Sequence, residues 1–167
     1  RLPLLHSRYG QPHSHYGHRP LSAQHHPVVH RHPRVRICAI FANGNLLCFD
    51  HDGNKKWSKN IGIPSNVYGY SCSLVIHEGL LIVQFDSNEK VSVMGFDTST
   101  GEQKWETLRR GRASWASPVI AHFNGQAQVV INGNPEVAAF DPVSGKELWS
   151  LEVLTGDVAP SLAVNSS

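Results

Sequence analysis

One short pattern occurs three times in the chain: a Phe–Asp pair, then a Gly, then a Trp four residues after the Gly. Phe140 lies 44 residues after Phe96, and Phe96 lies 47 residues after Phe49. Self-similarity at such a period constrains the architecture more strongly than any local feature does. The sequence therefore predicts a repeat protein. Its three marked segments are CFDHDGNKKW (48–57), GFDTSTGEQKW (95–105) and AFDPVSGKELW (139–149).

Each copy of the pattern predicts a β-hairpin. In the third copy, residues 137–140 favour a strand, and Asp141 can accept backbone N–H bonds that fix the start of a turn. Gly145 supplies the positive φ that ends the turn. Because the Gly-to-Trp offset is the same in all copies, nine positions are assigned a structural role: Asp50, Gly53, Trp57, Asp97, Gly101, Trp105, Asp141, Gly145 and Trp149.

The rest of each period contains further short β-rich runs and no sustained helical periodicity. Four short antiparallel strands per repeat are typical of a β-propeller blade, so the predicted fold class is all-β. A β-sandwich is the alternative, but it needs no strict period. The predicted runs are 27–29 (weak), 37–42, 73–76, 80–85, 117–123 and 127–132.

The predicted domain organisation is a partial propeller over residues 25–167. Its blades span roughly 25–60, 70–109 and 114–152, and another blade starts at 159–167. Propellers close with about four to eight blades, so a ring requires further repeats or further copies of the chain. We expect the chain to be a fragment of a larger propeller, with open apolar blade faces.

Residues 1–24 fall outside the repeat pattern. The first 34 residues hold eight of the chain's eleven His and have no Asp, Glu or Lys. Three interpretations stay open: a metal-binding tract, a disordered extension, and sequence from a displaced frame or a mis-joined end. The irregular His spacing fits no closed metal site. Residues 1–24 are therefore interpreted as foreign or disordered sequence.

The pattern Ala–x–Asp–x–x–Thr–Gly–x–x–x–Trp resembles the tryptophan-docking repeat of the propellers named after pyrrolo-quinoline quinone (PQQ). The third copy matches with Ser for Thr, the second with Gly for Ala, and the first less closely. The resemblance implies that the Trp of each blade packs against the neighbouring blade. The family includes quinone-dependent dehydrogenases and the propeller lipoprotein of the outer-membrane β-barrel assembly machinery.

Two functions follow from this resemblance. A quinoprotein dehydrogenase that oxidises alcohols or sugars would hold PQQ with calcium and use an Asp base. In the alcohol-oxidising members two adjacent Cys lie over the quinone, and this chain has no adjacent Cys pair. Asp50, Asp97 and Asp141 are assigned to turns, so no catalytic or metal site is predicted. We therefore favour a non-catalytic binding or scaffold module that needs no cofactor.

The candidate binding face lies where two sets of loops share one end of the blades. In an up-and-down blade, the loop between the second and third strands lies beside the connection to the next blade. Aromatic and Arg residues in these loops are types enriched at binding hot spots. A solvated loop, or an aromatic ring that covers its neighbour, is the alternative. The candidate residues are Tyr68, Tyr70, Arg109, Arg110, Arg112 and Trp115.

Charge and cysteine content limit the partners. The formal net charge of +2 gives no large surface for nucleic acid, so the expected partner is a protein or small ligand.

Cys38 and Cys48 lie on opposite arms of one hairpin and could pair, but buried free thiols are expected for them and for Cys72. The resemblance implies a periplasmic or other extracytoplasmic location, with membrane association only through an N-terminal anchor outside this sequence.

Overall fold

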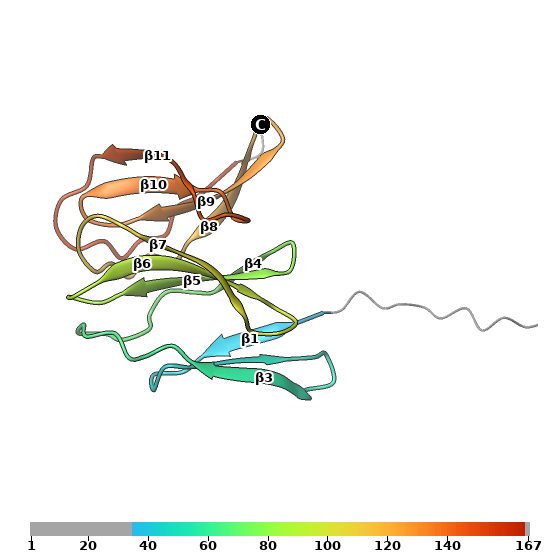
Figure 1. Cartoon of the computed structure of the whole chain (residues 1–167). Coiled ribbons are helices and arrows are strands. Elements are labelled where there is room, and N and C mark those ends of the chain that lie inside the picture. The colour runs from blue at the N-terminus through green and yellow to red at the C-terminus, as the bar shows by residue number, and fades with distance from the viewer. Residues whose placement is uncertain (1–34, 166–167) are drawn as a thin grey trace, which may run out of the picture. The chain divides into compact units, whose positions relative to one another are not determined.

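The computed structural model describes residues 35–165, which form eleven strands in three antiparallel sheets (Figure 1). Within each sheet, every strand pairs with the next strand in the sequence. The strands are β1 (Ile37–Ile40), β2 (Asn45–Phe49) and β3 (Lys55–Asn60); β4 (Val75–His77), β5 (Leu80–Asp86), β6 (Val91–Asp97) and β7 (Gln103–Leu108); and β8 (Val119–Phe123), β9 (Gln126–Asn132), β10 (Glu136–Phe140) and β11 (Glu147–Glu152).

These sheets are three blades, and the prediction of an all-β propeller fragment is confirmed. The first blade has three strands among the described residues, and its predicted weak strand at 27–29 lies outside them. The interpretation of residues 1–24 also lies outside them. Among residues 35–165, no helix has the length and hydropathy that a membrane span needs.

A β-bulge occurs at the same place in all three Phe–Asp hairpins, directly before the Phe. It sets each Trp opposite a small residue: Trp57 opposite Cys48, Trp105 opposite Gly95, and Trp149 opposite Ala139. A Cβ on Gly95 would collide with the indole of Trp105. The first position of the repeat is therefore small because the Trp ring lies over it.

The Asp residues of the repeat fix the turns, as predicted. Asp141 Oδ1 accepts the backbone N–H groups of Val143 at 3.1 Å and Ser144 at 2.7 Å, and Asp97 does the same with Ser99 and Thr100. These backbone hydrogen bonds lower the pKa of both carboxyls. The pKa of Asp50 is also well below its ordinary value, chiefly through its hydrogen bond with Lys56.

Consecutive blades are joined by a Trp of one blade stacked on the turn Gly of the next. A Cβ at Gly101 would collide with the Trp57 ring, and one at Gly145 would collide with the Trp105 ring. Trp57 Nε1 also donates to Thr98 O at 2.9 Å. Gly101 and Gly145 thus each receive the Trp of the preceding blade, so the Gly and the Trp of the second repeat serve two different junctions.

Trp149 departs from the expectation that every repeat Trp packs on a neighbouring blade. Its side chain is 43% exposed, and its Nε1 donates to Gln128 Oε1 of the same sheet at 3.0 Å. Within residues 35–165, no further sheet follows β11 to cover the ring. Residues 158–165 form no strand there, and they contact the third blade through Ser117 N–H, which donates to Ser161 Oγ at 3.0 Å.

Two apolar cores lie between the blades, one at each junction. The core between the first and second blades includes Leu46, Leu81 and Phe96. The core between the second and third includes Ile82, Val129 and Phe140. Since the single sheet of the second blade contributes one face to each core, the stability of a blade depends on its neighbours.

We expect Trp105→Ala to lower the free energy of unfolding by about 3–5 kcal/mol, because it removes a large ring from the second junction. Chemical denaturation followed by circular dichroism measures this change. A loss below about 1 kcal/mol would contradict the assignment of Trp105 to the junction.

Two Gly→Ala substitutions provide a matched test of the same contact. Gly145 has φ of 72° and faces the Trp105 ring, whereas Gly125 has φ of 77° and no atom lies within 4 Å of a Cβ built there. Both alanines carry similar backbone strain, and only that at 145 also clashes. We expect Gly145→Ala to destabilise more than Gly125→Ala by about 1–3 kcal/mol; equal losses would contradict the stacking.

Candidate functional site

The predicted loops do gather at one end of the blades. Ser65 N–H donates to Ser87 Oγ at 3.1 Å, and Asn88 N–H donates to Ser65 O at 2.9 Å. In the next repeat, Arg112 N–H donates to Asn134 O at 2.8 Å. The connection between two blades therefore lies beside the loop between the second and third strands, as the up-and-down topology predicted.

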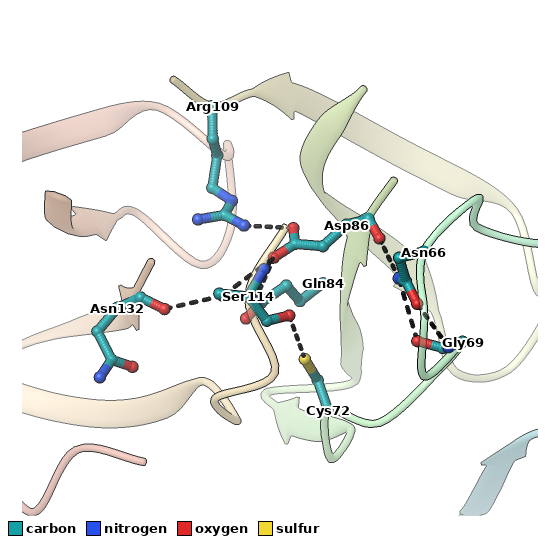
Figure 2. Close-up of polar contacts among 8 residues, drawn as sticks. All are labelled: Asn66, Gly69, Cys72, Gln84, Asp86, Arg109, Ser114 and Asn132. Atoms are coloured by element: carbon teal, nitrogen blue, oxygen red, sulfur yellow. Dashed lines mark hydrogen bonds and ion pairs between the residues drawn. The ribbon is translucent and has the colours of Figure 1, made fainter. Parts of the chain in front are cut away.

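The connection from β3 to β4 exposes several large apolar side chains. Val67 is 82% exposed, Tyr68 68% and Ile63 65%. Asn66 holds this segment in place: its Oδ1 accepts the Tyr68 N–H at 3.0 Å, and its Nδ2 donates to Asp86 O (Figure 2). The segment is thus an ordered apolar surface and is fixed to the end of β5.

The candidate aromatic residues take two different orientations. The ring of Tyr68 lies edge-on to Trp115, with centroids 5.1 Å apart, so these two residues lie together on the candidate face. Tyr70 instead donates its hydroxyl to Gly62 O and packs edge-on against Phe85. Burial raises the pKa of Tyr70 to about 12. Tyr70 therefore supports the loop, whereas Tyr68 is exposed and Trp115 beside it is partly buried.

The three arginines do not form a single basic patch. Arg109 is buried and pairs with Asp86. Arg110 is exposed but lies 3.2 Å from Glu136 Oε2 and 3.7 Å from Glu147 Oε1. Among residues 35–165, Arg112 makes no ion pair with a carboxylate. The Arg cluster predicted from sequence thus consists of two arginines held in ion pairs and one exposed arginine.

A buried polar network supports this end of the second and third blades (Figure 2). Asp86 accepts hydrogen bonds from Arg109, from Gln84 Nε2 at 2.8 Å and from the Ser114 N–H at 2.9 Å. The Ser114 hydroxyl lies 3.0 Å from Asp86 Oδ2 and 3.1 Å from Asn132 O. The residues of this network come from β5, from β9 and from the connection after β7. The network therefore joins the loops of the second blade to those of the third.

Sequence reasoning did not identify this network. The candidate residues predicted from the sequence include Arg109 but not Asp86, Gln84, Ser114 or Asn132. One signal was available: Asp86 ends the apolar run LLIVQF without belonging to a turn pattern. A carboxylate at the end of a buried strand needs a charged partner, and Arg109 stands at the end of the Trp strand of the same repeat.

The cysteines are in two states. Cys38 and Cys48 are directly opposite each other on β1 and β2 and form a disulfide, so the expectation of free thiols was wrong for this pair. Cys72 is free, and its thiol lies 3.7 Å from Ser114 O. Burial, and next the charge of Asp86, raise the pKa of Cys72 to about 12, so its thiol stays protonated at neutral pH.

The dehydrogenase hypothesis requires oxygen ligands for calcium beside the quinone, and several Asp side chains of residues 35–165 already have other partners. Calcium takes six to eight oxygen ligands, chiefly from carboxylates and carbonyls. Asp97 and Asp141 accept turn hydrogen bonds, and Asp86 is paired with Arg109. Within residues 35–165, no three His, Cys, Asp or Glu side chains gather as metal ligands would.

We expect Asp86→Asn to lower the free energy of unfolding by about 3–5 kcal/mol, because it leaves the Arg109 charge buried without its counterion. Asp52→Asn is the matched control: Asp52 is exposed in the first turn, and a change within about 0.5 kcal/mol is expected there. Similar effects of the two substitutions, measured by chemical denaturation, would contradict the role of the network.

We expect Cys72 to react slowly with iodoacetamide at pH 8 in the folded protein, because its thiolate is scarce and its side chain is partly buried. Mass spectrometry after unfolding should show one alkyl group without reductant and three with it, since the chain has three Cys. Rapid labelling of the folded chain, or three groups without reductant, would contradict these assignments.

The comparisons with known proteins agree with this fold. The model of the family described as outer membrane protein assembly factor BamB matches residues 65–166. BamB from Moraxella catarrhalis is 21% identical, with a TM-score of 0.54 over 70% of this chain and 33% of that chain. The quinohemoprotein alcohol dehydrogenase from Comamonas testosteroni is 15% identical, with a TM-score of 0.51 over 70% and 26%.

These structural similarities show the fold, and the chain spans a third or less of the length of both structures. No curated protein matches the sequence. The match of the family model covers more than half of the chain, including the second and third blades and their loops. The chain therefore belongs to the family of the outer membrane protein assembly factor BamB.

Proposed function

We propose that the chain is a non-catalytic β-propeller module that binds a partner protein through the loops at one end of its blades. The observation that carries the proposal is the ordered apolar surface of Ile63, Val67 and Tyr68, with Trp115 beside Tyr68. Exposed apolar side chains gathered on an ordered loop are typical of interaction sites, and aromatic residues dominate hot spots. We call this set the loop surface.

The chemistry of the loop surface favours a protein partner over nucleic acid. A phosphate backbone requires several free cationic groups, because each contact neutralises one charge. Arg109 and Arg110 are paired with carboxylates, so of the three arginines at this end of the blades only Arg112 has no carboxylate partner among residues 35–165. An exposed apolar loop fits a protein surface that presents an apolar groove.

Family membership suggests where this partner acts. The family is described as an outer membrane protein assembly factor, so we infer that the partner is a protein of an outer-membrane assembly machinery. The Cys38–Cys48 disulfide supports a location outside the cytoplasm, because disulfides persist in oxidising compartments. The module would then act as a scaffold that positions other proteins.

Site-specific photo-crosslinking tests this proposal. A photoreactive residue at Val67 on the loop surface should give an adduct with a component of the assembly machinery in bacterial cells. The control is Val143, which is 58% exposed in a Phe–Asp turn. An adduct from position 143 and none from position 67 would contradict the proposed surface.

We expect Tyr68→Ala to lower the yield of the Val67 adduct about tenfold, because a hot-spot aromatic contributes more than 1 kcal/mol to binding. Ser99→Ala, in an exposed turn of the second blade, is the control and should leave the yield unchanged. A yield that is unchanged by Tyr68→Ala would exclude this ring from the interface.

A further inference from the structure

Two histidines from neighbouring blades face each other at the end of the blades where the Phe–Asp turns lie. His77 is the last residue of β4 and His122 lies in β8, so the first strands of the second and third blades contribute one imidazole each. The ring centroids are 6.2 Å apart, and the ring planes are inclined by 62°. Because the two residues belong to different repeats, the sequence alone does not bring them together.

The separation of the two rings suits one shared metal ion. A Zn–N bond is about 2.0–2.1 Å long and the centre of an imidazole lies about 1 Å behind its nitrogen, so two rings on one ion have centroids at most about 6.4 Å apart. The observed 6.2 Å lies within this limit. Neutral imidazole is a common ligand of divalent zinc, copper and nickel. Rotation of the exposed His122 side chain is therefore enough to bring both rings onto one ion.

A hollow of about 200 Å³ gives an ion access to both rings. Its lining includes the two imidazoles and two carboxylate residues, Glu78 and Asp141. Glu78 Oε1 lies 4.0 Å from His77 Nε2. Asp141 uses Oδ1 for its hydrogen bonds to Val143 N–H, Ser144 N–H and the Ser144 hydroxyl. The two negative charges of this hollow favour a divalent cation over an anion.

The residue that brings a carboxylate to His77 has an unusual backbone conformation. Glu78 has φ of 46° in the turn between β4 and β5. Gly, Asn and Asp are the residues favoured at such a turn position. The corresponding turn of the third blade has Asn124 there, with φ of 48°. Since Asn closes this turn in the next repeat, turn formation does not explain Glu78, and such strain is typical of functional sites.

We propose that His77 and His122 bind one divalent transition-metal ion, such as Zn²⁺, which links the second blade to the third. Within residues 35–165, no third His, Cys, Asp or Glu is already placed as a ligand, so water molecules complete the coordination. Both ligands are brought together only when the two blades are packed. Binding of the ion therefore stabilises this junction.

The metal site is independent of the loop surface. The strand β5 separates the turn at Glu78 from the loop at Ser87, which is hydrogen-bonded to Ser65 of the β3–β4 connection. The two sites thus lie at opposite ends of the blades. Loss of the metal site would leave the proposed protein-binding surface in place.

Residue-resolved modification with diethyl pyrocarbonate tests the site in the full chain, because it reports each imidazole separately from the eight His of the first 34 residues. We expect Zn²⁺ at pH 7.5 to slow modification of His77 and His122 about fivefold or more, and EDTA to restore both rates. His51 is the internal control, since it is exposed and lies 3.4 Å from only one carboxylate, that of Asp52. Its rate should change by less than about twofold.

The substitution His122→Gln gives the decisive result. Because His122 is exposed, the variant should keep its circular dichroism spectrum, yet Zn²⁺ should no longer protect His77. Phe123→Ser is the matched control, because Phe123 is 67% exposed in the same strand and does not line the hollow; protection should be unchanged there. Lack of protection in the wild-type chain, protection of His77 that persists in His122→Gln, or equal protection of His51 would overturn the proposal.

Discussion

The contact between an indole ring and a glycine backbone determines how the repeats are joined. Trp57 on Gly101 and Trp105 on Gly145 set the distance between successive sheets. Because the ring touches backbone, a methyl group at either Gly would force the blades apart. Gly101 and Gly145 therefore each have two structural roles. The positive φ closes the turn of the residue's own blade, and the absence of a Cβ leaves room for the Trp ring of the preceding blade.

The buried network of Asp86 and Arg109 adds a constraint that the repeat does not supply. The first blade has no counterpart of this pair. Its β1 ends at Ile40, before the turn at Asn43–Gly44, and Ile61 occupies the position four residues after Trp57 that Arg109 occupies after Trp105. At the first junction the residue at this position is apolar, and Ile61 packs against the core there. A buried ion pair adds little net stability but disfavours wrong arrangements, so it fixes the second junction and its loops specifically.

The sequence predicts the features that repeat and misses those that occur once. The Phe–Asp turn, the Gly-to-Trp offset and the shared end of the loops follow from the period and from turn chemistry. The Asp86–Arg109 pair does not, because the partners are 23 residues apart and the sequence cannot show that both are buried. The opposite orientations of Tyr68 and Tyr70 also depend on tertiary contacts: Tyr70 is drawn inward by Phe85 and Gly62 O.

The division between repeated and unique features also separates structure from function. The faces of the sheets must all have the same apolar chemistry, because each has to fit the blade beside it, and this leaves little freedom for specific recognition. The connections between blades carry no such requirement. The segment from Ile61 to Tyr70 can therefore expose Val67 and Tyr68 while Asn66 ties it to Asp86 O. The proposed binding surface would therefore take its rigidity from the blades and its specificity from residues that occur in only one repeat.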